Sequence, residues 1–252
     1  MNPLLIALIV FVCVFSGGMI GLYLRALLPE HHLKEESTGV VKLGTGLIGT
    51  LAALVLGLLI ASAKSNFDRV SDDVAGTAAK MVLLDRALAA YGSEAQETRD
   101  LIRRAFASTV EMVSGNGPVL RELDASRRLA RFQEVQAKLR ELAPQNDTQR
   151  SLKSRALELS NDLEQMRWLL IEQGQGSIPA PFLVTLVLWL AIIFAGFGLV
   201  SVKNTTVVTT FLLCALSVSG SIFLIEELNS PLEGLMKVSI APLRNVLAHL
   251  GE

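Results

Sequence analysis

Histidine and cysteine, the side chains that most often carry proton-transfer or nucleophilic chemistry, are scarce here: the 252 residues include three histidines and two cysteines. Hydrolytic and thiol catalysis need such a side chain beside a partner group. Cys13 and Cys214 lie within apolar runs, where a free thiol behaves as a small apolar group, and His249 is isolated near the C-terminus. We therefore expect no catalytic residue, no disulfide framework, no bound cofactor and no enzyme activity.

The other two histidines, His31 and His32, lie near Glu30, Glu35 and Glu36 between two apolar runs. Imidazoles beside carboxylates can bind a metal ion or respond to pH. Polar residues of a short loop are more often simply hydrated, because they are rarely buried. We expect solvated side chains there and no metal site.

An excess of positive charge is also missing, since the formal net charge is −1 and aromatic residues make up 6% of the chain. In the middle of the sequence, arginines such as Arg103 and Arg127 alternate with acids such as Asp100 and Asp124. A nucleic-acid surface would combine net positive charge with interleaved aromatics. The central segment therefore indicates a solvated surface, and nucleic acid is not an expected partner.

Charge is absent altogether from four long apolar runs, and the mean hydropathy of the chain is +0.46. A helix needs about 20 apolar residues to cross the hydrocarbon core, because lipid cannot hydrogen-bond an exposed backbone. The runs are Pro3 to Leu24, Leu43 to Ala63, Ile178 to Val202 and Thr205 to Ile225. Each is long enough to span, and only Lys203 and Asn204 separate the last two, which predicts a tight helical hairpin.

These runs predict an all-α integral membrane protein with four transmembrane helices and a cytoplasmic helical bundle inserted between spans two and three. The expected organisation has two transmembrane helices in residues 1–63, the cytoplasmic domain in 64–177, the hairpin in 178–225 and a cytoplasmic C-terminal segment in 226–252. The lipid bilayer is thus the first expected partner.

An even number of spans places both termini and the inserted domain on one side. Basic residues near the membrane favour the cytoplasmic side. The side that carries the domain has more of them: Lys64, Arg69, Lys80, Arg167, Lys237 and Arg244, against Arg25, Lys34, Lys42 and Lys203. We therefore expect cytoplasmic termini and a cytoplasmic central domain.

A heptad stripe of apolar and small residues continues from the second span into the insert, from Ile60 to Tyr91, with no proline to interrupt it. The stripe predicts one long helix that ends at Gly92. Core packing within one chain is the simpler explanation of such a stripe. A seam between subunits is the alternative.

Small residues at four-residue spacing in the second span favour that seam, because they let transmembrane backbones approach closely. They are Gly49, Ala53, Gly57 and Ala61. Glycines of the same region, from Gly44 to Gly49, also match the dinucleotide-binding pattern G-x-G-x-x-G. We reject that interpretation, because these glycines open an unbroken apolar helix and no strand precedes them.

Three stretches resemble a bacterial bestrophin-like membrane family: LLIASAKSNFD at 58–68, LDRALAAYG at 84–92 with Glu94 and Arg99, and NSPLEG at 229–234 with Val238 and Pro242. The family-like C-terminal motif comprises Asn229, Pro231 and Gly234, although the family more often has an acid in place of Asn229 and an aromatic in place of Leu232. The resemblance implies a multi-pass protein of the bacterial inner membrane. Bestrophins are pentameric ion channels whose second span lines the pore, so it also implies a homo-oligomer, possible pentameric assembly and ions as the transported species.

The second span has a face suited to a pore. Projected at 100° per residue, five side chains share a narrow face roughly opposite the small residues: Leu51, Leu54, Leu58, Ser62 and Ser65. Leucine rings would form an apolar constriction, and the serines would rim a wider vestibule. Leucines that face lipid are the alternative.

Three functions compete. The first is a bestrophin-like oligomeric channel, and the second is a non-conducting membrane scaffold or signalling subunit whose cytoplasmic bundle binds partners. A proton-driven stator is the third and the weakest, because proton coupling usually needs a titratable group within the membrane, and the four runs carry none.

Overall fold

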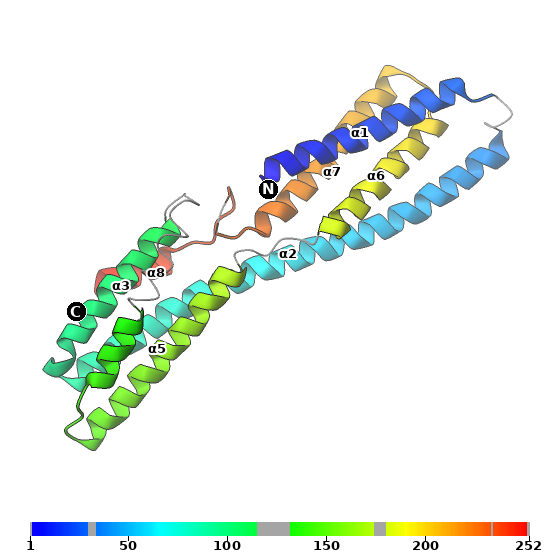
Figure 1. Ribbon diagram of the computed structural model, residues 1–252. Helices are drawn as coiled ribbons and strands as arrows, with labels where there is room; N and C mark the ends of the chain where they lie inside the picture. The colour runs from blue at the N-terminus through cyan, green and yellow to red at the C-terminus, as the bar shows by residue number, and fades with distance from the viewer. Residues whose placement is uncertain (1, 30–33, 115–131, 174–179, 233, 251–252) are drawn as a thin grey trace. The chain divides into compact units, whose positions relative to one another are not determined.

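The computed structural model describes residues 2–29, 34–114, 132–173, 180–232 and 234–250, and all of its regular elements within these ranges are helices (Figure 1). The elements are α1 (Pro3–Leu27), α2 (Glu35–Tyr91), the short 3₁₀ helix η2 (Ser93–Ala95), α3 (Gln96–Ser114), α5 (Asp147–Gln173), α6 (Ala180–Val200), α7 (Thr205–Leu228) and α8 (Ala241–His249). Residues 132–141 are helical as well. The predicted all-α class is confirmed.

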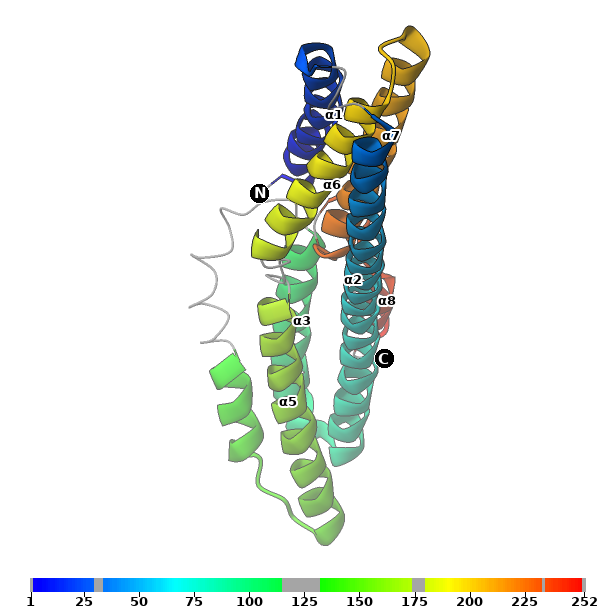
Figure 2. The ribbon, with the colours of Figure 1, turned by 90° about the vertical axis from the view of Figure 1, so that its right-hand side faces the viewer.

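Four of these helices, α1, α2, α6 and α7, are long and apolar enough to cross a membrane. They coincide with the four predicted runs, except that the beginning of the third run, at residues 178 and 179, lies outside the described residues. Helix α2 begins at Glu35, before its apolar run, and continues without a break to Tyr91 (Figure 2). The prediction of one long helix that ends at Gly92 is confirmed to within one residue.

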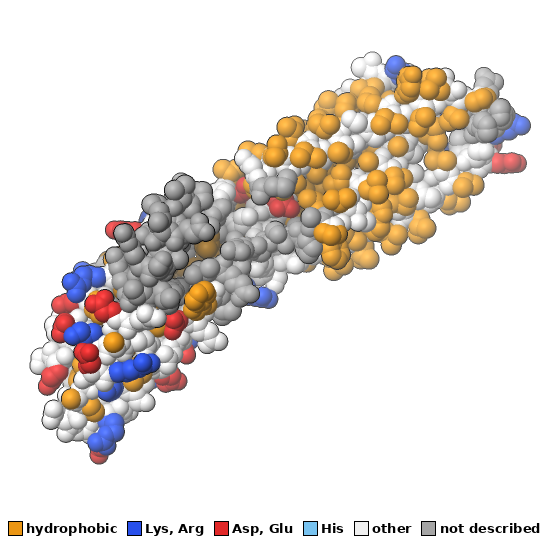
Figure 3. Space-filling model, viewed as in Figure 1, with side chains coloured by type: hydrophobic (Ala, Val, Ile, Leu, Met, Phe, Trp, Pro, Cys, Tyr) orange, Lys and Arg blue, Asp and Glu red, His pale blue; other side chains and the backbone are white. Residues whose placement is uncertain are grey.

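The chain divides into two compact units. The first, the membrane unit, comprises Met1–Phe67 and Gly176–Ser230, and the second, the helical unit, comprises Asp68–Gln175 and Pro231–Glu252. Helix α2 contributes its first part to the membrane unit and its last part to the helical unit. Apolar side chains crowd the visible surface of the membrane unit, whereas charged side chains are scattered over the helical unit (Figure 3).

Within the membrane unit, α1 packs against both α6 and α7. The core between them contains fully buried branched side chains, Val10 and Val14 of α1, Leu186 of α6 and Ile222 of α7. Two asparagines begin helices here, because a short amide side chain can accept an orphan N–H of the first turn. Asn2 accepts from the backbone of Leu4 at 3.1 Å, and Asn204 accepts from Val207 at 2.8 Å.

Glycines bring α1 and α6 into close contact. A Cβ atom on Gly17 would lie 2.6 Å from the carbonyl oxygen of Ala191, and one on Gly198 would lie 2.7 Å from the backbone nitrogen of Leu22. A Cβ on Gly21 would collide with the carbonyl oxygen of Ala195. These backbones can approach only because the side chains are missing.

At the far end of α6, Arg25 of α1 donates to the carbonyl oxygens of Leu199 at 3.3 Å and Val200 at 2.6 Å. The last carbonyls of a helix have no partner within the helix, and they carry partial negative charge. The guanidinium therefore both satisfies these acceptors and fixes the end of α6 to α1.

In the helical unit, the heptad stripe of α2 becomes core: Val70, Val74, Met81, Leu84, Leu88 and Tyr91 are buried. Ile102 and Phe106 of α3 and Ala156 and Leu159 of α5 are buried too. Gly92 then adopts a φ of 124°, a conformation that side chains rarely allow, and this turn ends α2.

Polar contacts join the same helices. Asp85 of α2 accepts two hydrogen bonds from Arg99 of α3, at 2.8 and 2.9 Å, and the side chains are 15% and 11% exposed. The hydrogen bond to Asp85 raises the pKa of Arg99 above its ordinary value. Lys80 of α2 also pairs with Asp162 of α5 at 2.6 Å.

Candidate functional site

The apolar part of α2 packs against its own chain with only one face. Thr45, Ala52 and Ala63 are buried on that face, and Ile48 and Val55 pack partly against the membrane core. Thr45 lies very close to Gly196 of α6: a Cβ atom on Gly196 would collide with the methyl group of Thr45. Gly196 thus makes room for the contact between α2 and α6.

The five candidate pore-lining residues lie on another face of α2, and all five are exposed. The exposed fractions of Leu51, Leu54 and Leu58 are 44%, 64% and 62%, and Ser62 and Ser65 are exposed as well. Within the described chain, these side chains form an uncovered strip of leucine that continues into serine.

The candidate packing residues lie on a third face. Ala53, Gly57 and Ala61 are exposed, and Gly49 is partly exposed. A Cβ placed on Gly49 or Gly57 would meet no atom of the described chain within 4 Å. Among the described residues, the small-residue stripe therefore makes no close helix contact, and it leaves a shallow surface on which another backbone can lie.

Projection at 100° per residue separates the packed face, the leucine face and the small-residue face by about 120° from one another. From the sequence, the leucine face and the small-residue face were expected to be roughly opposite. The position of the packed face shows that both belong to the uncovered side of α2. One face of this span is occupied by its own chain, and two faces remain available.

Helix α2 is also the least covered of the four spans. In its most apolar window 11% of the residues are buried, whereas the corresponding share is 33% in α1 and 28% in both α6 and α7. The other spans cover one another, but α2 lies at the margin of the unit.

Sequence reasoning missed several glycines that make close contacts within the chain, among them Gly17, Gly21 and Gly198. The signal was present, because Gly17 and Gly21 have the same four-residue spacing as the stripe in α2. Spacing alone does not say which small-residue stripe is used within a chain.

The family-like motif closes α7 and shapes the segment after it. Asn229 follows the last residue of α7, is 9% exposed and donates its backbone N–H to the carbonyl oxygen of Ile225 at 3.0 Å. Pro231 is buried, and its carbonyl oxygen accepts a hydrogen bond from the backbone of Val238 at 2.8 Å. Gly234, with a φ of 87°, lies in the turn that this bond closes. The bond joins the two ends of the segment from Pro231 to Val238, and glycine is needed at Gly234 for the positive φ.

Metal-binding groups of three or more His, Cys, Asp or Glu residues do not occur among the described residues. His31 and His32, the histidines of the first loop, lie outside them. Cys13 and Cys214 are free and exposed on apolar helices, and His249 contacts the backbone oxygen of Asn245 at 2.8 Å.

Comparisons with known proteins agree with this architecture. A family model for the Bestrophin-like domain matches residues 12–243. The crystal structure of a bacterial bestrophin homologue from Klebsiella pneumoniae, which carries a mutation, superposes with a TM-score of 0.66 at 14% sequence identity, and the match covers 96% of this chain and 97% of that chain. At that identity the likeness concerns the fold. No curated protein sequence matches the chain.

Proposed function

Because this chain belongs to the Bestrophin-like family, we propose that it assembles into a homo-oligomeric ion channel of the bacterial inner membrane, with α2 lining the pore. The proposed lining is Leu51, Leu54, Leu58, Ser62 and Ser65, and the proposed subunit interface is Gly49, Ala53, Gly57 and Ala61. Five copies would match the pentamers that the resemblance to bestrophins implies.

The observation that carries this proposal is the exposure of α2. One copy supplies one strip of leucine and serine, so a closed pore needs several copies arranged around an axis. The geometry of α2 supports such a ring, because a pore-lining helix must face its own subunit, a neighbouring subunit and the pore. The three faces of α2 meet these three requirements.

Leucine rings would set the conduction barrier. A narrow apolar ring excludes water and therefore ions, and widening or hydrating it opens the path. Ser62 and Ser65 would then line a wetter section beyond the constriction. Because none of the lining side chains is charged, an ion would meet an apolar gate and no fixed charge within the span.

The competing function is a non-conducting scaffold or signalling subunit. The same exposed leucines suit this function if they face lipid, since lipid tails are as apolar as leucine. In that case the helical unit would bind partner proteins, and α2 would surround no pore.

Ion flux into liposomes separates the two functions. We expect Leu54→Ser and Leu58→Ser to raise flux at least about tenfold over wild type, which corresponds to a barrier lower by about 1.4 kcal/mol. Leu188→Ser on α6 is the matched control, because Leu188 is similarly exposed at 57% but lies outside α2. Background flux from both α2 variants, in oligomers verified by cross-linking, would favour the scaffold.

The proposed topology has cytoplasmic termini and a cytoplasmic helical unit, with the domain boundaries expected from the sequence. It can be tested in a chain whose two native cysteines are replaced. A cysteine at Arg103, exposed on α3, should resist a membrane-impermeant thiol reagent in intact cells, and a cysteine at Asn204 should react. The reverse pattern would invert the orientation and leave the four spans unchanged.

A further inference from the structure

One end of the membrane unit carries two basic side chains that pair with no acid of the described chain. Arg25 is partly exposed in the last turn of α1, and Lys203 is exposed in the loop that joins α6 to α7. Glu35 and Glu36, exposed at the start of α2, form no ion pair with either of them. Both positive charges are therefore available to a group outside the described chain.

Arg25 is held by neutral groups and keeps part of its guanidinium unused. Both of its hydrogen bonds, to the carbonyl oxygens of Leu199 and Val200, come from Nη1. A guanidinium has five N–H donors, so the donors on Nε and Nη2 have no partner among the described residues. Nε and Nη2 form one edge of the planar fork, and such an edge matches two oxygens of a phosphate group. The bonds from Nη1 orient this edge in advance.

Lys203 brings a second positive charge to the same end. It follows Val200, whose carbonyl oxygen accepts from Arg25, by three residues. An extended chain covers at most about 3.6 Å per residue, so the backbones of Val200 and Lys203 lie within about 11 Å of each other. The lysine ammonium lies on a flexible four-carbon stem. It can therefore turn toward an anion that Arg25 binds.

Exposed apolar side chains adjoin the two basic residues along the chain. Tyr23 and Leu24 directly precede Arg25 and are 66% and 44% exposed, and Val202 directly precedes Lys203 and is 64% exposed. Helices α1, α6 and α7, which meet at this end, are each long and apolar enough to cross a membrane. Tyrosine, lysine and arginine at the end of a span are typical of the depth at which lipid headgroups lie. A headgroup phosphate is thus the anion that these residues would meet.

We propose that Arg25 and Lys203 bind the phosphate headgroup of an anionic phospholipid at this end of the membrane unit. The edge formed by Nε and Nη2 of Arg25 binds two phosphate oxygens, and the ammonium of Lys203 binds the same headgroup. A zwitterionic lipid carries its own cation beside the phosphate, so two basic residues favour an anionic lipid. The proposal depends on the membrane spans and is independent of conduction.

The test is a titration of the full-length detergent-purified protein with short-chain phosphatidylglycerol and, separately, phosphatidylcholine, read as the shift in melting temperature. Phosphatidylglycerol should stabilise wild type more, and equal shifts would contradict a preference for anionic lipid. Lys203→Gln removes one charge and no hydrogen bond of the described chain. It should bind phosphatidylglycerol about fivefold more weakly, which corresponds to about 1 kcal/mol. Arg25→Lys keeps the charge but loses the planar fork, so it should weaken binding as well.

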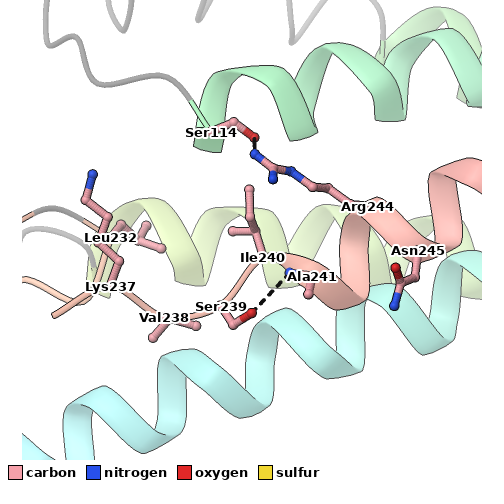
Figure 4. A pocket seen from close by; sticks show the side chains of 9 residues that line it. All are labelled: Ser114, Leu232, Lys237, Val238, Ser239, Ile240, Ala241, Arg244 and Asn245. Carbon is pink, nitrogen blue, oxygen red and sulfur yellow. Dashed lines mark hydrogen bonds between the residues drawn. The ribbon is translucent and has the colours of Figure 1, made fainter.

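Each variant has a matched control. Lys42→Gln removes an exposed lysine from α2 in the same unit. Arg244→Lys changes an arginine of the helical unit that is likewise held by a neutral oxygen, since it donates from Nη2 to Ser114 Oγ at 3.2 Å (Figure 4). Both controls should bind phosphatidylglycerol as wild type does.

Two results would overturn the site: equal weakening by Lys42→Gln and Lys203→Gln, which would indicate general surface charge, or unchanged binding in both Lys203→Gln and Arg25→Lys. Lys203→Gln keeps the test decisive if the loss of the bonds from Arg25 to α6 impairs folding. Equal stabilisation by inorganic phosphate would overturn the lipid as the ligand.

Discussion

Helix α2 passes through both units, and its two parts are buried to different degrees. In its most apolar window only 11% of the residues are buried, and leucines such as Leu54 and Leu58 are more than 60% exposed. In the helical unit, by contrast, nearly every stripe residue from Val70 to Tyr91 is buried. One helix therefore leaves its apolar side chains uncovered in one unit and packs them in the other.

The difference shows what each solvent demands. Water drives apolar side chains together, so the stripe of the helical unit has to find partners. Lipid exerts no such force between helices, so the association of transmembrane helices depends on close van der Waals packing and on polar contacts. The membrane unit accordingly relies on glycine contacts between α1 and α6, and it can leave two faces of α2 uncovered, as the proposed subunit interface and pore require.

The largest effect on the stability of the membrane unit is expected from a larger side chain at Gly21. In Gly21→Leu the side chain would collide with the carbonyl oxygen of Ala195, and backbone cannot move aside as a flexible side chain can. We expect a loss of more than about 3 kcal/mol of unfolding free energy, or no folded protein at all. Fluorescence-detected size exclusion in detergent would measure this, and a monodisperse, heat-stable variant would contradict the close contact.

The neighbouring residues Leu83 and Leu84 test the packing of the helical unit. Leu84 is 1% exposed and Leu83 is 47% exposed. Leu84→Ala should lower the unfolding free energy by about 3 kcal/mol, because it leaves a cavity in the core. Leu83→Ala should change it by less than about 0.5 kcal/mol. Similar losses in thermal melts of both variants would mean that a second surface covers Leu83.

The ion pair between Asp85 and Arg99 tests whether polar contacts stabilise the helical unit as much as the buried heptad stripe of α2 does. Arg99→Met removes one partner and leaves a carboxylate that is 15% exposed without its two hydrogen bonds. We expect a loss of about 2 kcal/mol, less than for a deeply buried pair because both side chains reach some solvent. In a double-mutant cycle, Asp85→Asn should cost little once Arg99 is absent; strictly additive losses would show that the pair does not act as a unit.

The smallest effect on folding is expected at Gly57, in contrast to Gly21. Gly57→Leu meets open space within the chain, so the thermal stability of the monomer should stay within about 0.5 kcal/mol of wild type. Cross-linking should nevertheless show fewer oligomers, because a bulky side chain would separate the helices that meet on the small-residue face. Unchanged oligomer yield would remove Gly57 from the proposed interface.

Much of the fold could be predicted from the sequence. The four spans follow from the length of uncharged apolar runs, and the end of α2 follows from Gly92 after an uninterrupted stripe. The resemblance that three short stretches indicated is confirmed by the match to the Bestrophin-like domain. Each of these inferences depends on local composition, which the sequence states directly.

The candidate site could be predicted less completely. Its residues were found by periodicity, but their role as pore or interface stays a prediction. The packed face of α2, the contact of Thr45 with Gly196 and the role of Arg25 at the end of α6 were not anticipated. A spanning helix is apolar on every side, so its sequence carries no amphipathic signal that marks the face turned toward its own chain.

By itself, the sequence determined which segments are helical, which of them can span a membrane and where small residues permit close approach. Only the tertiary structure decided that Gly17, Gly21 and Gly198 make close helix contacts among the described residues, whereas Gly49 and Gly57 do not. A glycine has no side chain and so lets another helix approach closely. The contact also needs a second helix whose backbone has a matching shape at the same depth. That second backbone is distant in the sequence, and its position is set by the packing of α1 on α6 and α7.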